Sequence, residues 1–296
     1  MSTTHGERLD DAVEVFAAQR RRLFGIAYRM LGTVADAEDI VQEVWIRWQN
    51  TDRSEVKEPG AFLTTIVTRL SINVLQSARA QRETYVGPWL PEPVNTDDDP
   101  ALGAERAEAL QFAIMLTLEK LTPTERAAYI LREAFDYPYP RIADVISSSV
   151  VSARQLVSRA RAHLVSARRA EVQPAAQRRL LEAFLIAAQN GDAGALEKLF
   201  AADVVSYTDG NGVKLAARIP VIGRRRVAAF VAAFANHFWT GKSIGWVEVN
   251  GQTAATLIEG DAITTMVTAT TSEDGIEQLL WVMSPQKLQH VAAIAG

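Results

Sequence analysis

The sequence predicts a multidomain protein in which two all-helical domains are followed by an α+β domain. Its 296 residues are enough for two domains or slightly more, at about 150 residues each. Apolar residues recur at helical spacing through residues 10–82 and again through 105–169. After about residue 175 we expect helices at 175–190, at 192–200 and around 224–238. Runs rich in Val, Ile, Thr and Trp follow at 246–249, 253–259, 262–270 and 276–283, with turn sequences such as Asn250-Gly251 between them, as is typical of antiparallel strands. This order is typical of α+β domains.

The composition is that of a globular protein and argues against several other classes. Hydrophobic residues make up 48% and charged residues 22% of the chain. With no cysteine and only four histidines, we expect no disulfide, no metal site and no cofactor. No apolar run reaches 18 residues, and the N-terminal segment has no basic stretch followed by an apolar one. We therefore expect a cytoplasmic protein without membrane contact.

Charge is distributed unevenly along the chain. The net charge is −4, from 31 basic and 35 acidic residues, which alone disfavours a nucleic-acid binder. The stretch 141–169, however, contains six arginines and a single acid, Asp144. A local excess of positive charge is a better indicator of nucleic-acid binding than the global value.

Two helices of the first domain carry polar faces of opposite character. Near Thr33, a capping sequence predicts the start of a helix on which Asp36, Asp39 and Glu43 share one face, with Gln42 beside them. The helix spanning 61–82 has no acid and presents Thr65, Arg69, Asn73, Gln76 and Arg79 on roughly one face. Arginine and amide side chains read base edges and phosphates, and an acidic face can bind a basic partner. For both helices, the alternative is a plain solvated face.

Residues 121–165 predict a helix-turn-helix. The pattern is a helix, a turn, a short helix, a tight turn at 147–149, and a last helix that Ser149 can cap. Ala153, Val157 and Ala160 point inward, which leaves arginines on the outer side of a basic recognition helix. The alternative is an ordinary helical hairpin. Serine occupies the turn, where glycine is common.

The segment 83–105 interrupts the helical pattern. It contains the string GPWLPEPVNTDDDP, with four prolines and three consecutive aspartates. Proline stiffens such a segment and the acids keep it solvated, so it predicts a linker.

Three segments resemble a known family. "TVADAEDIVQEVWIRW" is similar to region 2 of bacterial RNA polymerase sigma factors, and "LTPTERAAYILREAFDYPYPRIADVI…ARQLVSRARAHL" is similar to their region 4. The linker string "TYVGPWLPEP" and the segment "AFLIAAQNGDAGALEKLFAADVVSYTDGNGVK" resemble the extracytoplasmic-function (ECF), sigma-J-like subgroup, which carries a fused C-terminal SnoaL-like domain. The resemblance implies region 2 at 8–82, a linker at 83–105, region 4 at 106–169 and a cone-shaped SnoaL-like α+β domain at 175–296.

The resemblance also implies partners and site residues. The expected partners are core RNA polymerase, through the clamp helices of its largest subunit and its beta-subunit flap, and promoter DNA. The residues implied for core binding are Asp36, Asp39, Gln42 and Glu43. Those implied for the minus-10 element are Arg69, Asn73, Gln76, Arg79 and Arg82. Those implied for the minus-35 element are Ser149, Ser152, Arg154, Gln155, Ser158, Arg159 and Arg161. The linker would thread toward the RNA path, where Asp97–Asp99 could occupy a basic channel.

The chain departs from the subgroup pattern at three places. A glycine-rich Asp-Gly-Gly-Gly-Lys stretch is replaced by Asp209-Gly210-Asn211-Gly212-Val213-Lys214, and an Asn-Pro-Asp-Lys-Leu string by residues 284–288, SPQKL. Asn73 stands where aspartate is common. These differences bear on regulation and promoter preference rather than on the sigma assignment.

Several functions remain open for the third domain. We expect a regulator that docks through the polar loop 209–218, with Asp209, Lys214 and Arg218 as contact residues. A small-molecule sensor with a ligand in its cavity is a second possibility. A cyclase-like enzyme would need an acid/base set, for which Asp209, His237 and Lys214 are the candidates; no spacing singles out a catalytic pair, so we expect no enzyme. A helix-turn-helix regulator with a ligand-sensing or cyclase-like effector domain is the alternative for the whole chain.

Overall fold

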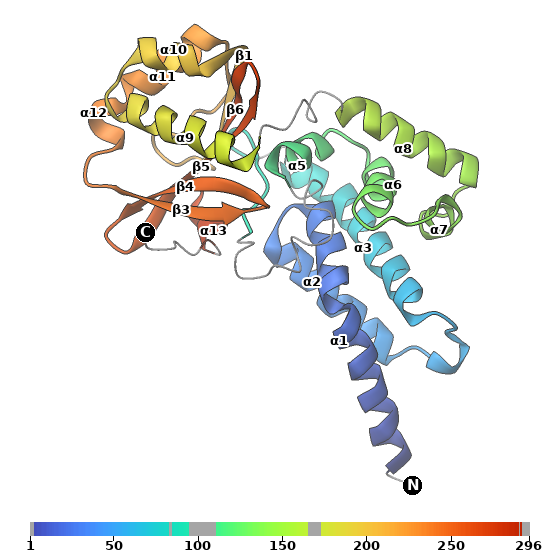
Figure 1. The fold of residues 1–296 in the computed structure, drawn as a ribbon. Helices are drawn as coiled ribbons and strands as arrows, with labels where there is room; N and C mark the ends of the chain where they lie inside the picture. The colour runs from blue at the N-terminus through green and yellow to red at the C-terminus, as the bar shows by residue number, and fades with distance from the viewer. Residues whose placement is uncertain (1–2, 83–84, 95–110, 165–172, 290, 292–296) are drawn as a thin grey trace. The chain divides into compact units, whose positions relative to one another are not determined.

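The computed structural model describes residues 3–82, 85–94, 111–164, 173–289 and 291 (Figure 1). The chain divides into two compact units, each made of segments that are discontinuous in sequence, and helix α5 (Phe112–Leu118) is divided between them. The first unit comprises the described residues 3–81 and 114–164. The second contains residues 85–94 and the described chain from 173 onward. Among the residues described, no helix is both long enough and apolar enough to cross a membrane.

The first unit begins with a bundle of long helices. These are α1 (Thr3–Leu31), α2 (Val34–Gln49) and α3 (Pro59–Arg82), with a short 3-10 helix, η1 (Arg53–Glu55), before α3. The Thr33 hydroxyl accepts the Asp36 N–H and caps α2, as predicted. The apolar residues Ala37, Ile40, Val41, Val44 and Trp48 recur at helical spacing and form a buried stripe along one side of α2. The opposite side of α2 is thereby left for polar residues.

A helix-turn-helix completes the first unit, as the sequence predicts. Helix α6 (Pro123–Glu133) starts with a capping box between Thr122 and Glu125, and is followed by α7 (Tyr139–Val145) and α8 (Val150–Leu164). Between α7 and α8, Ser147 adopts a left-handed backbone with φ of 53°, and the Ser148 N–H donates to the Ala143 carbonyl at 2.8 Å. This is the geometry of a helix C-terminus that usually requires glycine, so serine takes glycine's conformation here.

The second unit is a mixed sheet covered by helices. Its helices are α9 (Pro174–Gln189), α10 (Ala193–Leu199), α11 (Arg224–Ala233), α12 (Ala235–Phe238) and α13 (Pro285–Leu288). Its strands are β1 (Phe200–Asp209), β2 (Val221–Ile222), β3 (Ser243–Val249), β4 (Gln252–Glu259), β5 (Ala262–Ser272) and β6 (Gly275–Val282), in the order β2-β1-β6-β5-β4-β3. Helices α9 to α12 gather on one side of this sheet (Figure 1).

The sequence anticipates only part of this sheet. The four strands β3–β6 and their antiparallel pairing agree with the expectation. Hydrophobic periodicity did not indicate β1 or β2, and β1 pairs with β6 in parallel. A parallel partner is reached through a long crossover, so no local turn sequence announces it. The helix expected over 224–238 is divided at Phe234 into α11 and α12.

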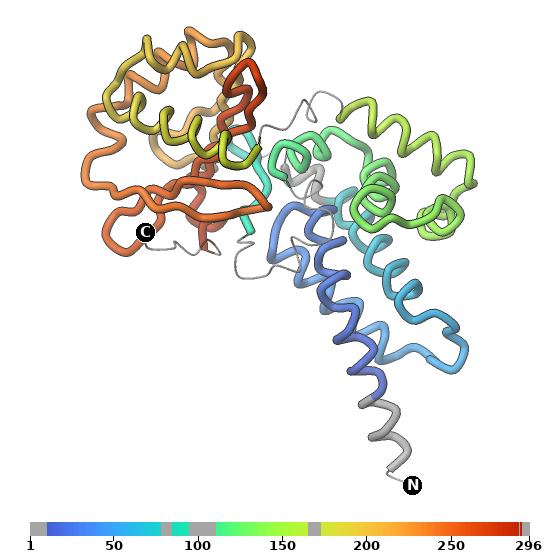
Figure 2. Tube along the Cα trace, viewed as in Figure 1, coloured from blue at the N-terminus to red at the C-terminus, as the bar shows by residue number. Residues whose placement is uncertain are grey.

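Residues 85–94 form part of the second unit, where they are seen as the cyan segment beside the sheet in Figure 2. Leu90 is fully buried, and Pro91, Glu92, Pro93 and Val94 are buried as well. The expectation of a solvated linker is therefore wrong for these residues, because apolar Leu90 and Val94 pack instead of facing water. Asp97–Asp99 lie outside the described residues.

Candidate polymerase- and promoter-binding surfaces and the linker clamp

The acidic side of α2 is open to solvent. Asp36, Asp39 and Gln42 are exposed, and they lie opposite the buried stripe of the helix. Glu43 is partly buried and forms an ion pair with Arg47 one turn later, at 2.7 Å. The four residues that sequence reasoning grouped together thus share a side of α2, on which Arg47 partly balances the charge of Glu43. This side can bind a basic helix or groove by charge complementarity.

Among the residues of α3 that are proposed to read DNA, Arg69 is already hydrogen bonded to another part of the protein. Asn73 and Gln76 are exposed, whereas the side chains of Arg79 and Arg82 lie outside the described residues. The guanidinium of Arg69 donates from Nε to the Val145 carbonyl at 2.9 Å, and from Nη2 to the Asp144 carbonyl and to Ser147 Oγ, both at 3.0 Å. In this structure, Arg69 therefore binds the C-terminal end of α7, where the carbonyl groups of a helix attract a cation.

Further contacts join the bundle to the helix-turn-helix around Arg69. The hydroxyls of Thr64 and Tyr137 are hydrogen bonded at 2.9 Å, and Arg141 pairs with Glu58 at 2.6 Å. The guanidinium of Arg22 lies over the Tyr137 ring, 5.0 Å from its centroid. These contacts place the two helical halves of the first unit in a closed arrangement.

A buried arginine, Arg126, makes a further contact between the two halves of the first unit. Arg126 is almost fully buried, donates to the Met30 carbonyl at 2.6 Å and forms an ion pair with Glu119. Burial lowers the pKa of Arg126 to about 9, which leaves it positively charged near pH 7. A buried charge of this kind requires its partners, so it ties α1 to α6.

Helix α8 presents a largely basic outer side. Arg154, Gln155, Ser158, Arg159 and Arg161 are exposed, while Ser152 is partly buried. The Ser149 hydroxyl accepts the Ser152 N–H at 3.1 Å, so Ser149 caps the helix and Ser152 lies in its first turn. The inward residues Ala153, Val157, Ala160 and Leu164 are buried, as the helix-turn-helix pattern predicts. The arrangement suits a helix that enters the major groove.

Two of these arginines are held by carboxylates of α6. Arg159 pairs with Glu125 at 3.2 Å, and Arg161 pairs with Glu133 at 2.7 Å. Burial by itself would raise the pKa of Glu125, but its hydrogen bonds from Thr122 and the nearby charge of Arg159 outweigh this effect and lower the pKa. Glu125 therefore stays ionised and orients Arg159. Arg154 is placed differently, with its guanidinium 5.4 Å from the centre of the Tyr139 ring.

Within the second unit, residues 85–94 are held by one buried carboxylate. Asp209, at the end of β1, is completely buried. It accepts hydrogen bonds from the Tyr85 hydroxyl, from the Leu90 N–H at 2.7 Å and from Lys287 Nζ at 2.7 Å. We call this group of four residues, Tyr85, Leu90, Asp209 and Lys287, the linker clamp.

Lys287 binds the same segment by several interactions. Its ammonium donates to the Leu90 carbonyl as well as to Asp209, and it lies 4.2 Å from the centre of the Trp89 ring and 5.1 Å from that of Tyr85. Burial first, and then the hydrogen bond to Asp209, raise the pKa of the Tyr85 hydroxyl above its usual range, so Tyr85 remains a donor. The opposite charges of Asp209 and Lys287, together with the rings of Tyr85 and Trp89, thus hold residues 85–90 in place.

A second anchor holds the far end of the segment. Asn250 in the β3–β4 turn is buried and has a left-handed φ of 53°. Its side-chain oxygen accepts the Val94 N–H at 3.0 Å, and its own N–H donates to the Val94 carbonyl at 3.0 Å. The sequence identified Asn250 only as a turn residue. Its side chain also substitutes for a strand partner of Val94.

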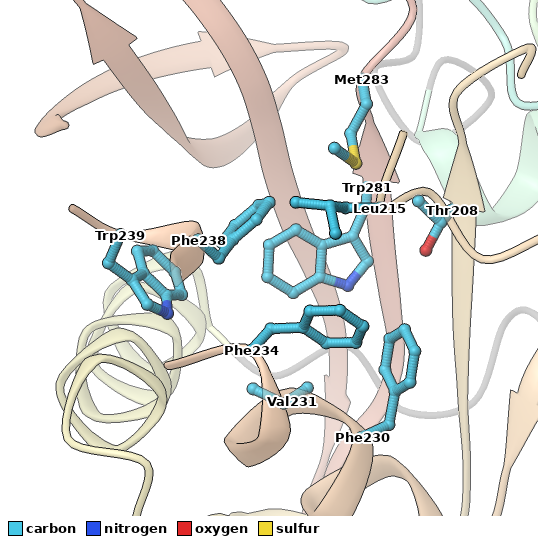
Figure 3. Close-up of a pocket in the computed structure, with 9 residues that line it drawn as sticks. All are labelled: Thr208, Leu215, Phe230, Val231, Phe234, Phe238, Trp239, Trp281 and Met283. Carbon is cyan, nitrogen blue, oxygen red and sulfur yellow. The ribbon is translucent and has the colours of Figure 1, made fainter. Parts of the chain in front are cut away.

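The structure corrects the residues proposed for the regulatory loop and for an acid/base set. Lys214 and Arg218 are exposed, but Asp209 is buried in the linker clamp and is not part of a docking surface. His237 is exposed on α12, and neither His237 nor Asp209 lines the aromatic pocket around Phe230, Trp239 and Trp281 (Figure 3). Sequence reasoning missed Tyr85, Lys287 and Asn250 as contact residues. Tyr85 and Lys287 lie in the strings TYVGPWLPEP and SPQKL, which the resemblance had singled out, whereas no sequence signal indicated the contact of Asn250 with Val94.

A helical bundle with an acidic surface, joined to a helix-turn-helix with a basic recognition helix, defines a DNA-binding transcription factor that also has a surface for a protein partner. The Sigma-70 region 2 family matches residues 15–81, and the Sigma-70 region 4 family matches residues 111–164. The ECF RNA polymerase sigma factor SigJ of Mycobacterium tuberculosis (strain ATCC 25618 / H37Rv) is 37% identical over 295 residues, which is 93% of this chain and 92% of the relative.

Two further comparisons agree. The probable ECF RNA polymerase sigma factor SigI of Mycobacterium tuberculosis (strain CDC 1551 / Oshkosh) is 29% identical and covers 77% of this chain and 78% of its own. The crystal structure of Mycobacterium tuberculosis SigJ superposes with a TM-score of 0.76 at 32% identity, covering 95% of this chain and all of that one. The chain belongs to the ECF RNA polymerase sigma factors.

We expect Asp209→Ala to destabilise the second unit by about 3–5 kcal/mol, because Lys287 would remain a buried charge without its carboxylate. Urea unfolding followed by tryptophan fluorescence measures this. The matched control is Lys214→Ala, five residues along the chain and exposed, for which a change within about 0.5 kcal/mol is expected. Equal stability of the two variants would show that the linker clamp does not hold this unit together.

Proposed function

We propose that this chain binds core RNA polymerase through the acidic side of α2 and directs it to promoters through α3 and α8. The observation that carries the proposal is the exposed, arginine-bearing α8 of a helix-turn-helix in a chain that belongs to the ECF sigma factors. In this proposal, α2 binds the clamp helices of the largest subunit, and region 4 lies near the beta-subunit flap. The protein then acts in the cytoplasm by binding, without a catalytic step of its own.

The proposed core-binding residues lead to a direct test. Reversing Asp39 and Glu43 to lysine changes the charge of the α2 surface by +4, while the buried stripe that folds the helix is untouched. Core affinity is expected to fall at least about tenfold, which corresponds to about 1.4 kcal/mol. Fluorescence anisotropy with labelled sigma factor and core polymerase measures this.

A matched control for this test reverses Glu259 and Asp261, exposed acids around the β4–β5 turn, to lysine. This control changes the net charge equally but leaves α2 intact, so core affinity should stay within about twofold of the parent. If both double variants bind core alike, α2 is not the docking surface.

DNA recognition is proposed to divide between two helices. Helix α8, with Ser149 at its cap and Arg154, Gln155, Ser158, Arg159 and Arg161 outside, would read the minus-35 element in the major groove. Helix α3, with Asn73, Gln76 and Arg69, would contact the minus-10 element and the strand exposed on melting. Because Arg69 is bound to the end of α7 in this structure, its use on DNA requires that contact to open.

The two arginines of α8 are expected to contribute differently. Among the described residues, no carboxylate forms an ion pair with Arg154, whereas Arg159 must exchange Glu125 for DNA. Arg154→Ala should lower specific promoter binding by about 1–3 kcal/mol, and Arg159→Ala by less. Binding of the holoenzyme to a promoter fragment at fixed salt, with Arg178→Ala on α9 as control, measures both. Parental binding by both variants would remove α8 from the interface.

We further propose that the third domain regulates the sigma domains through the linker. Residues 85–94 follow region 2 directly, and the linker clamp and Asn250 attach them to this domain. Attachment removes residues 85–94 from the tether that joins region 2 to region 4, and the tether is therefore shorter. A shorter tether raises the effective concentration of one region around the other, which favours their closed contact.

Promoter-dependent transcription tests this regulation. Deleting residues after about 170 should alter transcription while core binding persists, because the partners of residues 85–94 are removed. Tyr85→Phe, which removes a single hydroxyl from the linker clamp, should change transcription in the same direction by a smaller amount. Transcription in vitro with core polymerase compares the three proteins. Identical activity of all three at every promoter tested would contradict a regulatory role.

A further inference from the structure

Helix α8 carries an exposed apolar residue to which the function proposed above gives no role. Val151, the second residue of this helix, is 65% exposed. Within the described part of the first unit, the other large apolar side chains that are exposed are those of Val13 and Ile46, at 45% each. Valine is also a weaker helix former than alanine or arginine, because its branched side chain loses rotamer freedom in a helix. Val151 therefore adds little to the stability of the fold.

Val151 lies on the side of α8 that faces away from the protein. Each residue of an α-helix is rotated by about 100° from the one before, so positions 151, 155 and 158 fall on one line along the helix surface. The buried residues Ala153 and Val157 fall on the opposite side, where α6 and α7 pack (Figure 1). Gln155 and Ser158 are exposed, as Val151 is. We call Val151, Gln155 and Ser158 the outer row of α8.

The arginines of α8 lie beside the outer row. Arg159 and Arg161 are ion paired with carboxylates of α6, and the guanidinium of Arg154 lies 5.4 Å from the centre of the Tyr139 ring in α7. When a recognition helix enters the major groove, residues on its flanks can reach the phosphates, and residues on its outermost line face the base edges. The outer row of α8 therefore occupies the position from which bases are read.

A valine in this row has one kind of partner in the major groove. Hydrogen-bond donors and acceptors of the bases offer it nothing, but thymine also presents a 5-methyl group there. The methyl groups of Val151 can pack against that group and remove it from water. Cytosine has an amino group at the neighbouring ring position, and burying this donor against valine would cost its hydrogen bond to water. Val151 therefore favours thymine over cytosine.

The position of Val151 in the helix strengthens this assignment. Single exposed apolar residues are common on protein surfaces and by themselves need no explanation. Val151, however, lies in the first turn of a recognition helix, where helix-turn-helix proteins contact base edges, and the Ser149 hydroxyl caps that turn. Its β-branched side chain has few rotamers in a helix, so its methyl groups are presented in a fixed direction.

From these observations we propose that Val151 is a specificity-determining residue that packs against the 5-methyl group of one thymine in the minus-35 element. This inference rests on the proposed function of α8 and names a base that this helix reads. Loss of the Val151 side chain removes the discrimination of thymine from an analogue without the methyl group. It leaves the salt dependence of binding unchanged, because no phosphate contact is lost.

The test uses holoenzyme formed from the full chain and core polymerase. Promoter duplexes are enriched from a randomised pool by binding to this holoenzyme. Thymines of the minus-35 element are then replaced one at a time by deoxyuridine, which lacks only the methyl group. At one position, we expect the parent to bind the deoxyuridine duplex about three- to fivefold more weakly, the effect of one buried methyl group. Val151→Ala should bind the two duplexes with equal affinity.

Two control variants separate base reading from general effects. Val151→Ile keeps a branched aliphatic side chain at the same place and should keep the discrimination between the two duplexes. Ile219→Ala removes an apolar side chain that is 74% exposed in the second unit, and should keep both affinity and discrimination. For Val151→Ala, the slope of log affinity against log salt concentration should equal that of the parent, and a smaller slope would overturn the inference.

The outcomes distinguish this inference from the proposed function. If Arg154→Ala weakens promoter binding but deoxyuridine has no effect on the parent at any position, α8 reads the minus-35 element without Val151, and only the inference is overturned. The same holds if Val151→Ala still discriminates the two duplexes, or if it lowers affinity for core polymerase in the absence of DNA. If Arg154→Ala and Val151→Ala both bind like the parent, the proposed use of α8 fails together with the inference.

Discussion

The buried ion pair between Asp209 and Lys287 determines how the C-terminal half of this sigma factor is organised. Asp209 is fully inaccessible and Lys287 nearly so, and neither charge is stable in the interior unless its hydrogen-bonding capacity is used. Part of that capacity is supplied by residues before region 4, namely Tyr85 and Leu90. The segment between the sigma regions is therefore a structural part of the third domain, and this domain is incomplete without it.

In the regulation proposed above, this constraint is the means by which the third domain would act on transcription. Residues 85–94 are held at both ends, by the linker clamp and by Asn250, while the flanking chain leads to region 2 on one side and to region 4 on the other. An anchor in the middle of a tether changes the freedom of both ends without touching the DNA-binding or polymerase-binding residues.

The first unit contains a second constraint of the same kind. Arg69 binds the carbonyls at the end of α7, and Arg141 and Thr64 add contacts between the two sigma regions. A side chain proposed to contact DNA is thus satisfied within the protein when DNA is absent. Separating the two sigma regions breaks these hydrogen bonds, and contacts with core polymerase and promoter DNA must replace them. Closed contact within the first unit and a clamped linker in the second are both consistent with a sigma factor that is regulated within its own chain.

Local sequence determined much of this protein. The apolar stripe and cap of α2, the helix-turn-helix with Ser149 capping α8, and the Asn250-Gly251 turn follow from spacing and turn chemistry within a few residues. The family resemblance was carried by such strings, and it placed the candidate polymerase- and promoter-binding residues. Only the tertiary structure decided that β1 lies parallel to β6, that Arg69 is engaged by α7, and that Asp209 is buried rather than presented on a loop. Lys287 and Leu90 are 197 residues apart, and no local pattern encodes a contact at that separation. A buried charge depends on partners that the whole fold brings together. Local sequence could therefore indicate the exposed helix faces, whereas only the tertiary structure could show the linker clamp.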